Sequence, residues 1–317
     1  MKLIEAYRTA VEAGIKNDPR PKKDIDILLK ESKEAYDKLD EDKKEFFDKE
    51  RLWNPYADTR LSFGDPDTKV TKIAWGIDIG TGEMVLVDRL NEKGAKISAV
   101  AGHHPLGLGR TPFPEVMTMQ SDMYHAAGIP INIAEGLMDK RIDEVHRSVM
   151  PSNYNQSVDA ARLLNIPLMN IHTPADNMVQ RFLEDLFRKE DPKYVGDIID
   201  LLMTIPEYKI ASKQNSPPEI IAGKKKGRAG KIIFKMTGGT SGPKEIYEKM
   251  AQAGIGTAVG MHFPDSHIDE AKKNNINIVI AGHMSSDSLG INLIADLWEK
   301  KGIDLLPFSG VIRVSRN

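Results

Sequence analysis

Three short histidine motifs, each placed directly after an apolar run, constrain this chain more than any other feature. They contain His103 and His104, His172 and Asp176, and His283 and Asp287. Short apolar runs that end at glycine or polar residues are typical of buried strands. Open α/β folds place their sites where such strands end. The motifs therefore predict an α/β fold whose strands deliver several imidazoles and carboxylates to one site.

These side chains indicate a metal centre. Imidazole and carboxylate ligands together suit zinc, iron, manganese, nickel or cobalt, and five or more of them are too many for one tetrahedral ion. The chain has no cysteine, which excludes disulfides and thiolate ligands. We therefore expect two divalent metal ions per chain, held by nitrogen and oxygen ligands.

Each motif also has a simpler interpretation. His103 and His104 precede Pro105, where a strand would end and both imidazoles could reach one cavity, but they could equally be a turn cap and a solvated side chain. Asp176 and Asp287 each follow a histidine by four residues, which places both groups on one helical face. Either carboxylate could instead cap a helix.

Two of these residues have further possible roles. Asp176 lies at a strand-to-helix junction, where a carboxylate could bridge two ions. His172 could be a ligand, an outer partner of a ligand or a general acid and base, and we take it as the catalytic candidate. Four other histidines lack such a context, and of these only His262 follows a strand and is kept as a pocket candidate.

The pattern of apolar residues predicts alternating strands and helices beyond residue 70. Strands at 70–78 and 97–101 flank a helix at 83–93, which is a βαβ unit with parallel strands. Segments 124–133 and 161–171 resemble each other, and each predicts a helix end, an Ile-Pro step and a strand. The later predicted elements are strands at 231–236, 256–261, 276–281 and 309–314 and helices at 244–253, 266–274 and 289–301. We expect the strand at 309–314 to complete the first sheet.

Residues 237–242 form a glycine-rich turn between a predicted strand and a helix that begins near Pro243. Free backbone N–H groups in such a turn could hold an anion. The turn matches neither established nucleotide motif, so packing against a neighbouring element is the favoured interpretation.

Charge and hydropathy exclude several classes of partner. The chain has 317 residues with 44 Lys+Arg, 46 Asp+Glu and 6% aromatic residues, which disfavours a nucleic-acid binder. No apolar run approaches the ~18 residues of a membrane span. The first 16 residues predict an amphipathic helix without the features of a secretory signal, so we expect a cytoplasmic protein.

The motifs resemble those of the NIF-three-like family, metal-binding proteins often labelled GTP cyclohydrolase type-two-like. The family pattern has His-His-Pro, then His-Thr-x-x-Asp, then Gly-His-x-x-x-Glu. It corresponds here to His103-His104-Pro105, His172-Thr173-x-x-Asp176 and Gly282-His283-x-x-x-Asp287. Residues 54–65 and the turn at 237–239 also resemble family segments, so the resemblance covers about residues 50–317.

The resemblance implies two interleaved α/β domains, and the polar, helical pattern of the first 50 residues predicts an N-terminal helical extension before them. The expected limits are residues 1–50 for the extension, 51–189 with 281–317 for the first domain, and 190–280 for the second. The implied dinuclear ligands are His103, His104, Asp176, His283 and Asp287, with a homo-oligomer, a hexamer, as the assembly. Two departures are Asp287 in place of the family's glutamate and a longer segment between His104 and Asp176.

These expectations lead to one main functional hypothesis. The chain would be a divalent-metal-dependent hydrolase acting on a small-molecule substrate, and the family label implies a nucleotide such as GTP. The alternative is a non-enzymatic protein that stores, delivers or senses metal.

Overall fold

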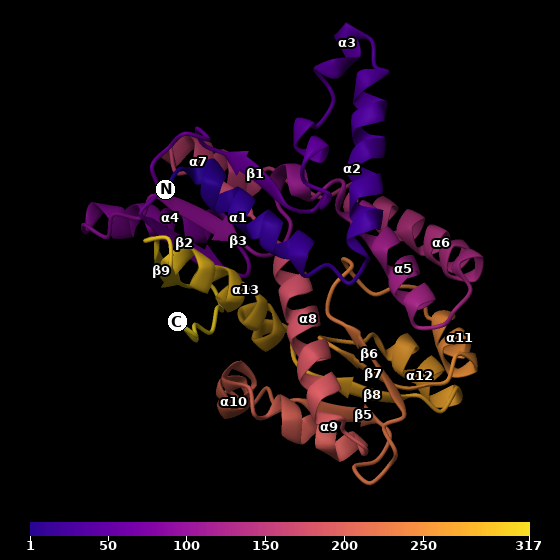
Figure 1. The fold of residues 1–317 in the computed structure, drawn as a ribbon. Coiled ribbons are helices and arrows are strands. Elements are labelled where there is room, and N and C mark those ends of the chain that lie inside the picture. The colour runs from indigo at the N-terminus through magenta and orange to yellow at the C-terminus, as the bar shows by residue number, and fades with distance from the viewer.

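The structure, a computed structural model, describes residues 1–317 and contains two β-sheets, each covered by helices (Figure 1). The first sheet has the strand order β1-β4-β3-β2-β9. Its strands are β1 (Arg60–Phe63), β2 (Lys72–Gly76), β3 (Ala99–Gly102), β4 (Leu168–Asn170) and β9 (Asp304–Pro307). β1 is antiparallel to β4, and all other neighbours are parallel. The carboxyl ends of β3 and β4 therefore lie side by side.

The second sheet has the order β5-β8-β7-β6. Its strands are β5 (Glu219–Ala222), β6 (Lys231–Lys235), β7 (Ile255–Gly260) and β8 (Asn277–Ile280). β6, β7 and β8 are parallel, and β5 is antiparallel to β8. Both sheets therefore consist of parallel strands with one antiparallel edge strand.

Successive side chains along a strand point to opposite faces of the sheet, and in the first sheet both faces are apolar. On β2, Ile73 and Trp75 face one buried cluster and Ala74 faces another. The helices α1 (Leu3–Lys16) and α13 (His283–Glu299) cover the first face, where Trp75 stacks at 4.6 Å on Trp298 of α13. The helices α4 (Thr81–Glu92) and α7 (Gln156–Leu164) cover the opposite face.

The second sheet is covered by helices from two distant parts of the chain. One face packs against α8 (Thr173–Glu190), α9 (Val195–Leu202) and α10 (Pro206–Lys213). The other packs against α11 (Ile246–Gln252) and α12 (Asp265–Lys273), and also against η3 (Phe113–Thr118), α5 (Met119–Ala126) and α6 (Ile131–Val149). The last three elements follow β3 and a short turn, η2 (Gly107–Gly109), in the sequence. The long segment between His104 and Asp176 thus crosses from the first sheet to cover the second.

The N-terminal helices divide into a buried and a projecting part. Leu3, Tyr7 and Ala10 of α1 are fully buried, and the indole Nε1 of Trp298 donates to the Ala6 carbonyl at 2.9 Å. The helices α2 (Lys22–Asp37) and α3 (Glu41–Lys44) extend away from the two sheets in Figure 1, before η1 (Lys49–Leu52) leads into β1.

The predicted fold class is confirmed, since the protein is mixed α/β with two sheets and N-terminal helices. Two of the predicted strands were wrong. Residues 131–133 open α6 instead of forming a strand, because the buried residues that follow are spaced as on a helical face: Ala134, Met138, Val145 and Val149. The last strand is β9, because positive φ angles at Ser309 and Gly310 end the extended backbone before residues 309–314.

None of the helices has the length and hydrophobicity that crossing a bilayer requires.

Candidate metal centre

Three strand ends deliver the six predicted site residues to one place. His103 and His104 follow β3, and His172 follows β4 as the residue before α8, whose first turn contains Asp176. His283 follows β8 as the first residue of α13, and Asp287 lies one turn later. β3 and β4 belong to the first sheet and β8 to the second, so the site lies between the two sheets.

The imidazoles and carboxylates lie too far apart to bond to one another directly. The closest nitrogen–oxygen pairs are His103 Nε2–Asp176 Oδ1 at 3.4 Å, His103 Nε2–Asp287 Oδ1 at 3.5 Å, His172 Nε2–Asp176 Oδ2 at 3.6 Å, His283 Nε2–Asp287 Oδ2 at 3.6 Å and His104 Nε2–Asp287 Oδ2 at 3.7 Å. These separations exceed the ~3.2 Å limit of ordinary N–H···O bonds. Two ligands of one tetrahedral ion, each about 2.1 Å from it, lie about 3.4 Å apart. The spacing therefore fits groups that share a cation.

Four buried polar atoms of the cluster have no hydrogen-bond partner: His103 Nε2, Asp176 Oδ1 and both carboxylate oxygens of Asp287. All three side chains are almost completely buried. Each such atom normally costs free energy unless something satisfies it. An ion bound between them would satisfy all four, so the residues present fit a metal centre.

Three of the four histidines, His103, His104 and His172, are oriented by partners on their other ring nitrogen. Nδ1–H of His103 donates to the Ile171 carbonyl at 3.1 Å, that of His104 to Asp78 at 2.7 Å and that of His172 to Asp58 at 2.6 Å. Carbonyl and carboxylate oxygens only accept, which assigns the proton to Nδ1 in each ring. Every Nε2 therefore presents its lone pair to the site, as in most metal-binding histidines.

Sequence reasoning did not identify Asp58 or Asp78. Asp58 is fully buried in the loop before β1 and also accepts from the Thr173 hydroxyl at 2.7 Å. Asp78 follows β2, and its side chain is 77% exposed. Both lie outside the three motifs, and only the position of Asp78 at the end of a predicted strand was a usable signal.

The electrostatics of the cluster favour positive charge between the carboxylates. Burial lowers the pKa of His103, but Asp287 and Asp176 outweigh it and raise that pKa well above its ordinary value. Burial and the neighbouring His103 and His172 lower the pKa of His104 to about 4. Burial would raise the pKa of Asp287, but His103 holds it below the usual value. A metal ion competes with protons for these groups.

The potential ligand atoms form two groups, His103 with His172 and Asp176, and His103 with His104 and Asp287. Within each group the atoms lie within 4.8 Å of one another. A single imidazole lone pair binds one ion, so His103 can serve only one of two ions. The two clusters are compatible with a dinuclear site whose second ion draws on the remaining side chains.

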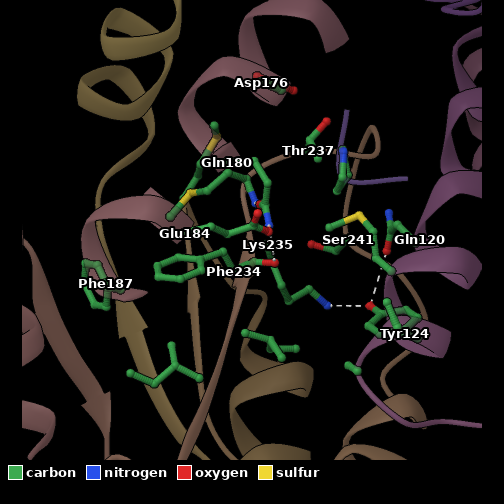
Figure 2. A pocket seen from close by; sticks show the side chains of 18 of the residues that line it. Gln120, Tyr124, Asp176, Gln180, Glu184, Phe187, Phe234, Lys235, Thr237 and Ser241 are labelled. Atoms are coloured by element: carbon green, nitrogen blue, oxygen red, sulfur yellow. Dashed lines mark hydrogen bonds between the residues drawn. The ribbon is translucent and has the colours of Figure 1, made fainter. Parts of the chain in front are cut away.

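The cluster opens into a cavity of about 520 Å³. His172, Asp176, His283 and Asp287 line one part of it, and the cavity continues along β6 to Lys235 and Tyr124 (Figure 2). His262, retained as a pocket candidate, also lines the cavity, and its ring centroid lies 4.9 Å from that of His283. The volume is in the range of sites for small organic molecules.

An α/β protein with buried His/Asp clusters compatible with a dinuclear metal site is the class that this fold and geometry define. No family model and no curated protein matches the chain. Among solved structures, it is similar to the crystal structure of a NIF3 superfamily protein from Sphaerobacter thermophilus, with 26% identity, a TM-score of 0.70 and coverage of 80% of this chain and 91% of that chain.

The chain is also similar to reduced HcgD from Methanocaldococcus jannaschii, at 13% identity and a TM-score of 0.51, over 78% of this chain and 87% of that chain. This second match shows a likeness of fold alone. The fold assignment depends on the match to the Sphaerobacter thermophilus protein. By that match the chain resembles NIF3 superfamily proteins in structure and has the NIF3-like fold, as the motifs predicted.

Proposed function

We propose that this protein is a divalent-metal-dependent hydrolase with a dinuclear centre. One observation carries the proposal: the buried Nε2 of His103 and the carboxylate oxygens of Asp176 and Asp287, none of which has a hydrogen-bond partner, lie 3.4–3.5 Å apart where a cavity of about 520 Å³ begins. A metal site that only stores ions needs no adjoining volume for an organic molecule. The cavity therefore favours catalysis over the alternative of a non-enzymatic metal carrier.

The candidate ligands are His103, His104, Asp176, His283 and Asp287. Bound divalent ions would supply Lewis acidity and lower the pKa of coordinated water. The protein's own contribution is to hold the ligands rigidly, because the ligands lie at strand ends and in the first turns of α8 and α13.

The carboxylates are the candidate bridges. Asp176 presents Oδ1 to His103 and Oδ2 to His172, while Asp287 presents Oδ1 to His103 and Oδ2 to both His104 and His283. A carboxylate whose two oxygens face different imidazoles is suited to bind two ions at once. Retention of both ions by Asp176→Ala would remove Asp176 from this role and leave Asp287.

His172 is the candidate proton acceptor. Asp58 holds the proton on Nδ1 of His172 and keeps the ring in one orientation, so Nε2 is free to accept a proton within the cavity. Asp58 would also stabilise the imidazolium that forms, as the carboxylate does in a catalytic triad. The same Nε2 lies 3.6 Å from Asp176, so ligation of an ion by His172 is the competing role.

His172→Gln distinguishes the two roles. If His172 transfers protons, the variant keeps about two ions per chain and loses turnover by about 10²-fold or more. If His172 is a ligand, the variant loses one ion. Elemental analysis of the purified variant, made alongside turnover measurements, gives the answer.

The finer assignments follow the family resemblance. The substrate would be a nucleotide such as GTP or another phosphate-containing small molecule, and the assembly a homo-oligomer, a hexamer, in the cytoplasm. These stay predictions, and light scattering of the purified protein would test the subunit count.

The first experiment is elemental analysis of protein purified without added metal, followed by assay against GTP and a panel of phosphate esters. We expect about two ions per chain and turnover that His103→Ala abolishes. Stoichiometric metal without turnover on any substrate would support the metal carrier instead. Absence of bound metal after reconstitution would contradict both functions.

A further inference from the structure

Lys235 is a cation without a counter-ion on the wall of the cavity. It is the last residue of β6, and its Nζ donates to the Tyr124 hydroxyl at 2.8 Å while lying 5.3 and 5.5 Å from the ring centroids of Tyr124 and Tyr247 (Figure 2). Lys235 forms no ion pair, although the side chain is largely enclosed. Enclosed charges in proteins are normally paired. An anionic group in the cavity would supply the missing partner and accept the remaining N–H groups of the ammonium.

The loop of residues 237–242, called the glycine loop below, offers further donors beside Lys235. Gln120 Nε2 donates to the carbonyls of Gly238 and Thr240 at 2.6 and 2.7 Å, which turns these carbonyls toward α5. None of the backbone N–H groups from 237 to 242 donates to a protein acceptor. The positive φ angles of Gly238 and Gly239, +91° and +80°, give the loop a conformation that other residues rarely adopt.

The loop lines the cavity together with Lys235. Gly239, Thr240 and Ser241 are lining residues, and Figure 2 draws Ser241 and Thr237 among the side chains of the cavity wall. A Cβ at Gly242 would lie 3.1 Å from the Tyr124 hydroxyl that accepts from Lys235, so the loop passes beside this pair. The hydroxyls of Thr240 and Ser241 have no protein partner and add two donors. Successive free N–H groups in a turn are a known arrangement for binding anions.

The surroundings of the loop are positive. Arg141 Nε donates to the Ser241 carbonyl at 3.0 Å, which places a second cation behind the loop. The nearby His267 is affected by the same positive charges: burial lowers its pKa, and Lys235, Arg141 and Lys244 lower it further, to about 4. The carboxylates that line the cavity are Asp176 and Asp287 at the candidate metal centre, Glu184 beside Gln180, and Asp191.

We propose that Lys235 and the glycine loop form a phosphate-binding subsite, and that the substrate is a phosphorylated small molecule whose phosphate lies there while its reacting end lies at the metal centre. The statement that the reacting end of the substrate lies at a metal centre rests on the proposed function. Phosphate fits better than carboxylate because the subsite offers an ammonium, two hydroxyls and a run of N–H groups, more donors than one carboxylate accepts. Phe187 and Phe234 line the same cavity and give an apolar surface for the organic part.

The test measures binding of inorganic phosphate to the metal-loaded, full-length protein by isothermal titration calorimetry. Lys235→Gln should weaken binding about tenfold or more, since a charge-assisted donor is lost. Lys231→Gln is the matched control: Lys231 lines the same cavity and loses the same charge, but its Nζ is already engaged by the Ala127 carbonyl at 2.6 Å. It should bind phosphate as the wild type does. Ser241→Ala removes one neutral donor and should weaken binding a few-fold.

Two outcomes would overturn the subsite: unchanged binding by Lys235→Gln, or equal loss in the Lys235 and Lys231 variants, which would indicate general charge attraction. Metal content measured on each variant confirms that the metal centre is intact, and Ser241→Ala provides a second test if Lys235→Gln does not fold. The phosphate-binding measurement and the turnover measurement can fail separately. Phosphate binding without turnover contradicts the hydrolase alone, and turnover with unchanged binding by Lys235→Gln contradicts the subsite alone.

Discussion

Removing the proposed metal ions should lower the stability of this protein by an amount that follows from the unpaired atoms of the candidate site. Four buried atoms of His103, Asp176 and Asp287 have no hydrogen-bond partner, and each costs about 1–3 kcal/mol when nothing satisfies it. The full cost is therefore about 4–12 kcal/mol. In metal-free protein the raised pKa of His103 keeps a proton between the carboxylates, which offsets part of this cost. We therefore expect the lower end, about 4 kcal/mol.

Thermal unfolding is the direct assay. Unfolding entropy is about 2.1 cal/mol/K per residue, so about 4 kcal/mol corresponds to a decrease of about 6 °C in the melting temperature of a chain of 317 residues. Calorimetry of the protein before chelation, after chelation and after metal is restored should show this decrease and its reversal. Asp287→Asn should melt at nearly the same temperature with and without metal.

Asp296→Asn is the matched control. Asp296 is a buried carboxylate of the same helix, but it accepts from Arg313 at 2.6 Å and from the backbone N–H of Arg316 at 3.0 Å. Its substitution should lower the melting temperature while the full effect of metal removal remains. Equal melting temperatures of wild-type protein with and without metal would refute the reasoning, because the unpaired atoms would then need no cation.

Three further outcomes are expected. Gly290→Ala should lower the free energy of unfolding measured in urea by about 3 kcal/mol and reduce the metal content. The reason is that a Cβ at this position would lie 2.2 Å from the Ala175 carbonyl oxygen where α13 crosses α8. Unfolding at the same urea concentration as the wild type would contradict that close approach. Asp78→Ala should weaken metal binding about tenfold in competition with a chelator, because His104 loses the acceptor that orients its ring. An unchanged affinity would mean that the exposed contact is dispensable. His267 has a folded pKa of about 4, below its unfolded value of ~6.5, so the unfolded state binds the extra proton and stability falls as the pH drops through that window. Between pH 7 and pH 4 the free energy of unfolding of His267→Gln should fall by about 1–2 kcal/mol less than that of the wild type. Equal decreases would show that His267 does not contribute to the pH dependence of stability.

The sequence was sufficient to predict that the six candidate site residues lie together, because each motif combines a strand end with a fixed spacing along the following turn. His172 and Asp176, and likewise His283 and Asp287, are four residues apart in the first turn of a helix. Chain order and strand polarity then bring the motifs to neighbouring edges. This information is local, so a single sequence contains it.

What the sequence did not reveal depends on contacts between distant segments. Asp58 reaches His172 across 114 positions, and no local pattern marks it as a partner. The helix α13 begins at His283 and not at Leu289 as predicted. Its first turns were missed because they contain buried serines, such as Ser285 and Ser286, and lack the apolar stripe by which a helix is recognised in a sequence. The segment 113–149 packs on the second sheet although the first sheet precedes and follows it in the chain.

The burial of α1 against α13 has a consequence for biosynthesis. The helix α1 leaves the ribosome well before α13 and packs on it, as the hydrogen bond from the Trp298 indole to the Ala6 carbonyl shows. His283 and Asp287 likewise emerge long after His103. A nascent chain therefore can neither cover this face of the first sheet nor present the full set of candidate ligands until α13 has been synthesised, and we expect the proposed metal ions to bind only after that point.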